Sequence, residues 1–81
     1  MRRSLSRWLG VAIRERRQGQ RLSQEELGAR ADLHRTYISM VERATRNISV
    51  DALDSVAEAL GVRPSQLLQQ AERLRDGKAR P

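Results

Sequence analysis

A polar helix face between residues 35 and 43 holds the side chains best suited to bind a ligand by hydrogen bonds. Residues of this region fall on two opposite faces at the period of a helix. The apolar face consists of Leu33, Tyr37, Ile38 and Val41. The polar face consists of Arg35, Thr36, Ser39 and Arg43. The planar guanidinium groups match the acceptors O6 and N7 of guanine, a threonine can donate a hydrogen bond or contact the methyl of thymine, and a serine permits close approach. The pattern therefore favours a helix that contacts base edges.

The segment before this helix predicts another helix directly beside it. Ser23 and Glu26 form a capping-box pattern, which predicts a helix start. Leu27 and Ala31 then form a short apolar stripe. Because no linker follows, residues of about 23–43 are predicted to form two short helices around a three- or four-residue turn. This is the helix-turn-helix arrangement, whose second helix, the recognition helix, fits the major groove of B-DNA.

The chain lacks the residue clusters that catalytic sites and metal-binding sites usually contain. It contains one histidine, His34, and no cysteine, and no carboxylate pattern accompanies that histidine to form a metal site. The sequence has no cluster for nucleophilic or acid–base catalysis and no glycine-rich phosphate loop. We therefore expect no enzyme, no metal and no cofactor. His34 is expected at the start of the recognition helix, in contact with backbone or phosphate.

The positive charge of the chain is concentrated at one end. The 81 residues carry a net charge of +6, and residues 1–21, with seven arginines against Glu15, account for all of it. This favours an anionic partner, double-stranded DNA, although a solvated basic helix or a compositional preference for arginine is the alternative. The sequence contains no signal peptide and no run of the roughly 20 apolar residues that spans a bilayer. We expect no membrane partner and a cytoplasmic location, which the absence of cysteine fits.

Three further helices complete an all-α domain. A first helix is predicted over about 4–18 from an apolar stripe. The stripe consists of Leu5, Trp8, Leu9, Ala12 and Ile13. Trp8 is expected in the core, the alternative being an exposed anchor for a partner. Ser49 predicts the start of a fourth helix and Gly61 its end, and Pro64 suits the first position of a fifth, through about Arg75. We expect one domain over residues 1–76, too small for a small-molecule effector site, and a disordered tail over 77–81.

The residues of the motif also carry a resemblance. LSQEELGARADLHRTYISMVERATRNIS resembles the helix-turn-helix of the Cro and lambda-repressor type, the XRE family. The run HRTYIS, then ER, then RN followed by Ile48 and Ser49 is similar to the controller proteins of restriction-modification operons. The resemblance covers about residues 9–68 and implies a compact, five-helix, lambda-repressor-like DNA-binding domain. Three positions depart from the family pattern: Gly28 replaces the usual Ala, and Asp32 and Ala44 each replace the usual Gly. Asp tolerates a left-handed turn, whereas Ala at such a position costs roughly 1 kcal/mol.

Residues around the motif have predicted roles as well. The resemblance pairs Arg17 with Glu42 in an ion pair that joins the first helix to the recognition helix, the alternative being two independent surface charges. Gln24 at the start of the motif, with Arg46 and Asn47 after it, would contact the DNA backbone on both sides. Tyr37 would pack its ring inward and direct its hydroxyl to a phosphate or base edge.

The fifth helix carries more leucine than a small core can bury. Leu67 and Ala71 suffice to face the core, so the surplus Leu68 and Leu74 suggest a two-fold dimer contact, the alternative being a helix that caps a monomer. Since one domain contacts too few bases to be selective, we expect a homodimer on an approximately palindromic operator. The resemblance implies autoregulation of a restriction-modification operon. An antitoxin-type or phage-repressor-like regulator that acts with a protein partner is the alternative, and RNA binding is disfavoured because two aromatic residues cannot form a stacking platform.

Overall fold

The computed structural model describes residues 4–79 and contains only helices over that range. The helices are α1 (Leu5–Gly19), α2 (Gln24–Ala31), α3 (Arg35–Glu42), α4 (Val50–Leu60) and α5 (Pro64–Ala79). The predicted all-α fold with five helices is therefore confirmed. The basic residues 2 and 3, part of the charged N-terminal segment, lie outside the described residues, as do residues 80 and 81 of the expected tail.

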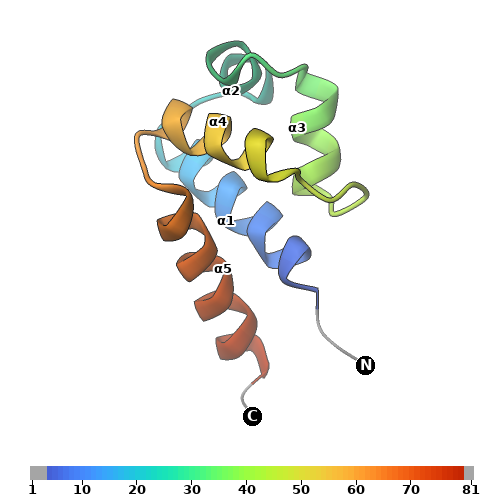
Figure 1. The fold of residues 1–81 in the computed structure, drawn as a ribbon, viewed down its shortest axis with the longest axis vertical. Coiled ribbons are helices and arrows are strands. Elements are labelled where there is room, and N and C mark those ends of the chain that lie inside the picture. The colour runs from blue at the N-terminus through green and yellow to red at the C-terminus, as the bar shows by residue number, and fades with distance from the viewer. Residues whose placement is uncertain (1–3, 80–81) are drawn as a thin grey trace.

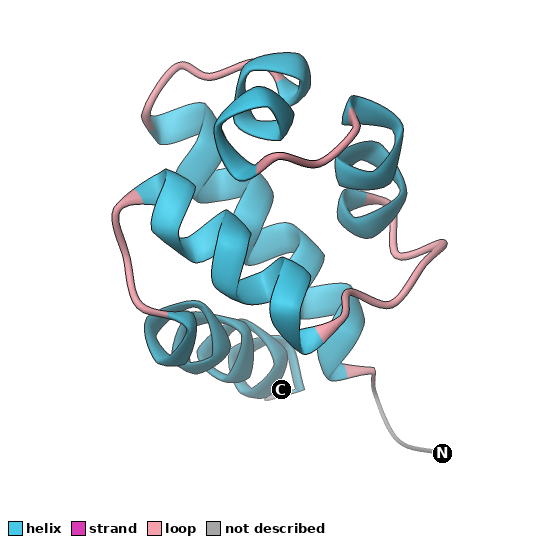
Figure 2. Ribbon diagram, turned by 45° about the horizontal axis from the view of Figure 1, so that its top comes forward, coloured by secondary structure: helices cyan, strands magenta, loops and turns pink. Residues whose placement is uncertain are grey.

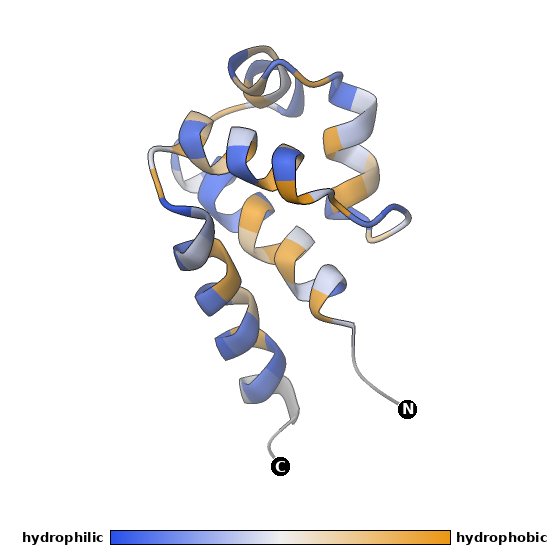
Figure 3. Ribbon diagram, viewed as in Figure 1, coloured by the Kyte–Doolittle hydropathy of each residue, from blue (hydrophilic) through white to orange (hydrophobic). Residues whose placement is uncertain are grey.

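One core joins all five helices. Its largest fully buried side chains come one from each helix: Ile13, Leu27, Ile38, Val56 and Leu67. Figure 1 shows α5 beside α1 and antiparallel to it, with α2 and α3 toward the end of the molecule away from the C-terminal end of α5. The connections between the helices are short loops (Figure 2). Apolar segments of α1, α3 and α4 lie toward the middle of the molecule, whereas the outer side of α5 is polar (Figure 3).

The predicted apolar stripes face this core. Trp8 is 9% exposed and packs with the other buried residues, so its expected place in the core is confirmed. On α5, Leu67 and Ala71 are fully buried, whereas Leu68 and Leu74 are half-buried and pack against the edge of the core.

Local signals set most helix ends. Ser49 Oγ accepts from Ala52 N at the start of α4, and Gly61, with a φ of 75°, ends that helix in the left-handed conformation. Helix α1 ends at Gly19, and Arg21, two residues later, adopts the left-handed conformation with a φ of 58°. Helix α5 continues past its predicted end near Arg75 and through Gly77. A single glycine in a helix costs only about 1 kcal/mol and does not stop it.

Candidate nucleic-acid interface

The helix-turn-helix forms as its capping residues predict. At the start of α2, Ser23 Oγ accepts from Glu26 N, and the Glu26 carboxylate accepts from Ser23 N, both at 2.9 Å. The hydrogen bond that the Glu26 carboxylate accepts from the backbone nitrogen of Ser23 lowers the pKa of Glu26. Asp32 ends α2 in the left-handed conformation with a φ of 57°. Helix α2, the first helix of the motif, is thus capped at both ends.

Gly28 explains one departure from the family pattern. A Cβ atom at this position would lie 2.5 Å from the carbonyl oxygen of Leu33 and 3.3 Å from the backbone nitrogen of Arg35. The turn therefore packs directly on the backbone of α2, closer than an alanine would permit. This contact sets the spacing between α2 and the start of α3.

His34 lies immediately before α3 and caps it. Its Nδ1 atom accepts a hydrogen bond of 3.0 Å from the backbone nitrogen of Thr36. This fits the expected position of His34 at the start of the recognition helix. The cap leaves the opposite edge of the imidazole ring exposed, where Nε2 can contact a phosphate.

Helix α3 exposes the predicted polar row on one side. Arg35, Thr36 and Arg43 are exposed and Ser39 is half-buried, whereas Ile38 and Val41 on the other side are buried. Arg35 Nη1 donates to Glu25 Oε2 at 3.0 Å. Arg43, one residue past the end of α3, donates weakly from Nε to its own helix at the carbonyl of Ser39, 3.4 Å away. Both guanidinium groups thus lie at the surface, at opposite ends of the row.

A nearly buried network joins α3 to α1 and α2. Arg17 on α1 donates to both carboxylate oxygens of Glu42, at 2.7 and 3.0 Å, and also to the carbonyl of Leu22 at 2.7 Å. The side chains of Arg17 and Glu42 are 11% and 3% exposed. Hydrogen bonding to Glu42 raises the pKa of Arg17. The charged pair that the resemblance implies is thus present in the structure, and both of its members are mostly shielded from water.

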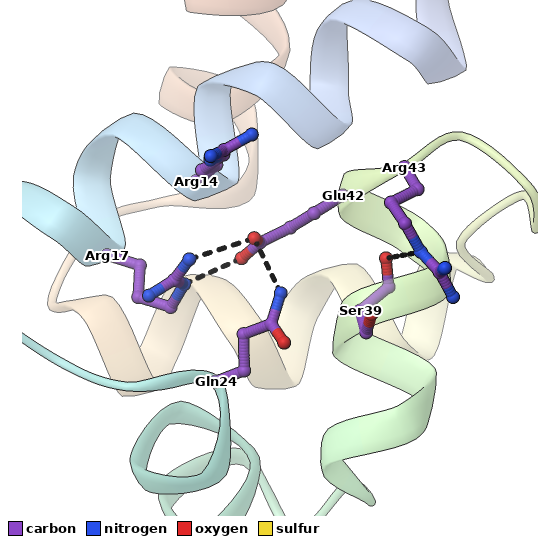
Figure 4. Close-up of a pocket in the computed structure, with 6 residues that line it drawn as sticks. All are labelled: Arg14, Arg17, Gln24, Ser39, Glu42 and Arg43. Carbon is purple, nitrogen blue, oxygen red and sulfur yellow. Dashed lines mark hydrogen bonds and ion pairs between the residues drawn. The ribbon is translucent and has the colours of Figure 1, made fainter.

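Gln24 belongs to the same network. Its Nε2 atom donates to Glu42 Oε1 at 3.1 Å, so its side chain supports the end of α3 (Figure 4). The sequence predicts instead that Gln24 contacts the DNA backbone. In this arrangement its amide oxygen and the N-terminal end of α2 are the groups left for that contact.

An open pocket of about 230 Å³ lies over this network. It is lined by Arg14, Arg17, Gln24, Ser39, Glu42 and Arg43 (Figure 4). Arg14, which is exposed, joins α1 to the predicted site, and sequence reasoning missed it. Its position one helical turn before Arg17 is the signal that points to it.

The loop after α3 is held by Tyr37. The Tyr37 ring is half-buried, and its hydroxyl oxygen accepts from Ser49 N at 3.2 Å. The guanidinium of Arg46 lies over the ring, 5.3 Å from its centre. Ala44 has a φ of 59°, which is the strained left-handed conformation considered for this position because the family usually has Gly there. Asn47 is exposed. Arg46 and Asn47 thus both lie in the loop that follows α3.

The predicted dimer-contact residues Leu68 and Leu74 lie on another helix, α5.

Other kinds of site find no support in the described residues. No group of three or more His, Cys, Asp or Glu side chains within residues 4–79 is arranged to hold a metal ion. Over the same range, no helix is both long enough and apolar enough to cross a membrane.

Comparison with known proteins identifies the family. The family model described as helix-turn-helix matches residues 13–67. The control protein C.BamHI of Bacillus amyloliquefaciens is 55% identical over 47 residues, which are 58% of each chain. The chain therefore matches less than two thirds of that relative's length.

Two solved structures are similar over a larger share of the fold. The restriction-modification controller protein C.AhdI of Aeromonas hydrophila is 37% identical, with a TM-score of 0.75 over 76% of this chain and 94% of that one. The clp gene regulator ClgR of Corynebacterium glutamicum is 28% identical, with a TM-score of 0.90 over 95% of this chain and 82% of that one. The expected lambda-repressor-like fold is thus confirmed. The chain belongs to the XRE family of helix-turn-helix DNA-binding transcriptional regulators, which are not enzymes, and within that family it is similar to restriction-modification controller proteins.

Proposed function

We propose that this chain binds an approximately palindromic operator as a homodimer, with one α3 helix in the major groove of each half-site. The observation that carries the proposal is the exposed polar row of α3, whose opposite side is buried and whose C-terminal end is bonded to α1 and α2 through Glu42. A helix held in this way presents its side chains in a fixed orientation, which sequence-specific contacts require. In this proposal residues 1–76 act as a single DNA-binding domain.

The contacts divide by chemistry. Arg35, Thr36, Ser39 and Arg43 are assigned to base edges, because they form the exposed row. Arg46, Asn47 and His34 are assigned to the sugar-phosphate backbone, since they lie at the two ends of that row. We add Arg14 to the backbone group, because it is exposed and lines the same pocket as Arg43.

A homodimer supplies the selectivity that one domain lacks. Helix α3 has eight residues and contacts only a few base pairs, so two copies about one helical turn of DNA apart are needed to distinguish an operator. We assign the contact between copies to α5, where Leu68 and Leu74 are only half-buried by their own chain. The two-fold symmetry of such a dimer accounts for the palindrome.

The regulated genes follow from the relatives. Because the chain is similar to C.BamHI and C.AhdI, we infer that it controls a restriction-modification operon and binds upstream of its own gene, in the cytoplasm. The resemblance to controllers implies activation at low occupancy and repression at high occupancy. A second candidate is a regulator of genes outside a restriction-modification operon, which the structural similarity to the clp gene regulator ClgR favours.

Fluorescence anisotropy tests the proposal. We would titrate the purified chain on duplex DNA from upstream of its own gene and on a scrambled duplex, at about 150 mM salt. At least a thousandfold preference with two protomers per site is expected. A preference for a duplex from another locus alone would favour the second candidate. Equal and weak binding to every duplex would instead indicate an antitoxin-type or phage-repressor-like chain that requires a protein partner.

A further inference from the structure

The side chain of Arg35 is held by a single partner within residues 4–79. Its Nη1 atom donates to Glu25 Oε2 at 3.0 Å, and this ion pair is exposed, with 64% and 73% of the two side chains accessible to water. An exposed pair of this kind contributes little to the stability of the fold. Its geometry matters where the arginine binds DNA, because a neighbouring carboxylate decides in which direction the guanidinium points.

Both members of the pair are attached to rigid backbone. Glu25 lies in the first turn of α2, between Gln24, which is bonded to Glu42, and Glu26, which completes the capping box. Arg35 is the first residue of α3, directly after the capping residue His34. The close contact of Gly28 with the turn fixes the spacing between α2 and the start of α3. The backbone positions from which the two side chains extend are therefore held at a constant separation.

We propose that Glu25 is a positioning residue for Arg35, which fixes the guanidinium toward a base edge and keeps it from neighbouring phosphates. The proposal rests on the proposed DNA-binding function. An arginine has five donor hydrogens, so Nη1 can bond Glu25 and still leave donors for guanine O6 and N7. Once α3 enters the groove and water leaves, the attraction between carboxylate and guanidinium becomes stronger.

Glu25 also weakens binding to DNA of any sequence. Its negative charge repels phosphates, and an arginine bonded to a carboxylate is less available to neutralise them. Both effects act on every sequence, whereas the orientation of Arg35 favours only the correct base. Glu25 thus raises discrimination at one base pair and lowers general affinity.

Selection from a random duplex library, followed by sequencing, tests this role and does not require the operator sequence. The wild type, Arg35→Ala, Glu25→Ala and Glu25→Gln would be compared, with anisotropy on the selected and scrambled duplexes. Glu58→Ala is the matched control, because Glu58 is an exposed acid on α4, apart from the proposed dimer contact, and its removal changes the net charge equally. Melting curves would establish that each variant folds.

We expect Glu25→Ala to lower the preference at the Arg35-dependent base pair by about three- to tenfold, which corresponds to one hydrogen bond. Affinity for the scrambled duplex should rise about two- to fivefold. Glu25→Gln, which keeps an acceptor oxygen but loses the charge, should retain more of the base preference and show the same rise in general affinity. In the Arg35→Ala background the Glu25 substitution should no longer change any base preference.

Three results would overturn the role of Glu25 alone. They are equal discrimination by the wild type and Glu25→Ala, a loss of base preference that is uniform at all positions, and a loss that persists in the Arg35→Ala background. If the wild type itself selects no sequence, the proposed function fails and the role of Glu25 fails with it.

Discussion

Truncation of Glu42 is the sharpest test of how the recognition helix is held. Glu42 accepts three hydrogen bonds, two from Arg17 and one from Gln24, and its side chain is 3% exposed. After Glu42→Ala, Arg17 keeps only the carbonyl of Leu22 as an acceptor. Its guanidinium, 11% exposed, would then be a charge without a counter-charge. Breaking a buried pair in this way costs about 3 to 5 kcal/mol.

We expect the lower end of that range, about 3 kcal/mol, because the pocket beside Arg17 is open and lets water reach part of the guanidinium. For a domain of this size the loss corresponds to a decrease in Tm of roughly 12 to 24 °C. Thermal and urea unfolding followed by circular dichroism at 222 nm would measure it. The double variant Arg17→Met with Glu42→Leu should recover most of the stability, since it removes both charges together.

Glu25→Ala is the matched control, because it breaks an ion pair that is exposed. Its cost should not exceed about 1 kcal/mol and should shrink further in about 1 M salt, whereas the Glu42→Ala loss should persist there. A loss below about 1 kcal/mol for Glu42→Ala, or one abolished by salt, would refute the reasoning. Arg17 and Glu42 would then behave as two independent surface charges.

Five further substitutions test other features. Ala44→Gly should stabilise the fold by about 1 kcal/mol in urea unfolding, because glycine adopts the left-handed conformation without strain; no gain would mean that the loop relaxes in solution. Gly28→Ala should lower stability by about 2 kcal/mol and weaken DNA binding, since its Cβ would press on the turn 2.5 Å away; a neutral effect would show that the turn can move. Arg35→Ala should reduce the preference for the operator by roughly 1 to 3 kcal/mol, whereas Arg46→Ala should weaken all sequences alike and reduce the salt slope by about one; equal loss of specificity from both would contradict the division of contacts. Glu26 has a lowered pKa in the folded chain, so its ionised carboxylate contributes to the free energy of unfolding in full above its ordinary pKa of 4.5. That contribution is lost as the pH falls through the lower pKa of the folded chain. The free energy of unfolding of Glu26→Gln should therefore depend less on pH in that acidic range.

Features encoded by residues close together in the chain could be predicted from the sequence. The capping box at Ser23, the cap at Ser49 and the left-handed Gly61 each depend on side chains within a few residues, and all formed as predicted. The apolar stripes likewise follow from helical spacing alone, which is why the membership of the core could be predicted well.

Features that depend on distant segments could not be predicted from residue patterns. The hydrogen bond of Gln24 to Glu42 and the position of Arg14 at the pocket arise only when α1, α2 and α3 meet. For Arg17 and Glu42, the family resemblance supplied the pairing, since nothing in their own neighbourhood indicates a partner 25 residues away.

The contact at Gly10 joins α1 closely to α3, the proposed recognition helix. A Cβ at Gly10 would collide with the carbonyl of Val41, so the backbones of α1 and α3 touch there. On its other side α1 is bonded to α5, through Arg16 and Gln70. In a dimer formed through α5, helix α1 would therefore set the distance between the subunit contact and the proposed recognition helix. Substitutions on the outer face of α3 would change which bases are preferred, whereas substitutions along α1 would change the distance between half-sites. Base preference and half-site spacing could then evolve independently.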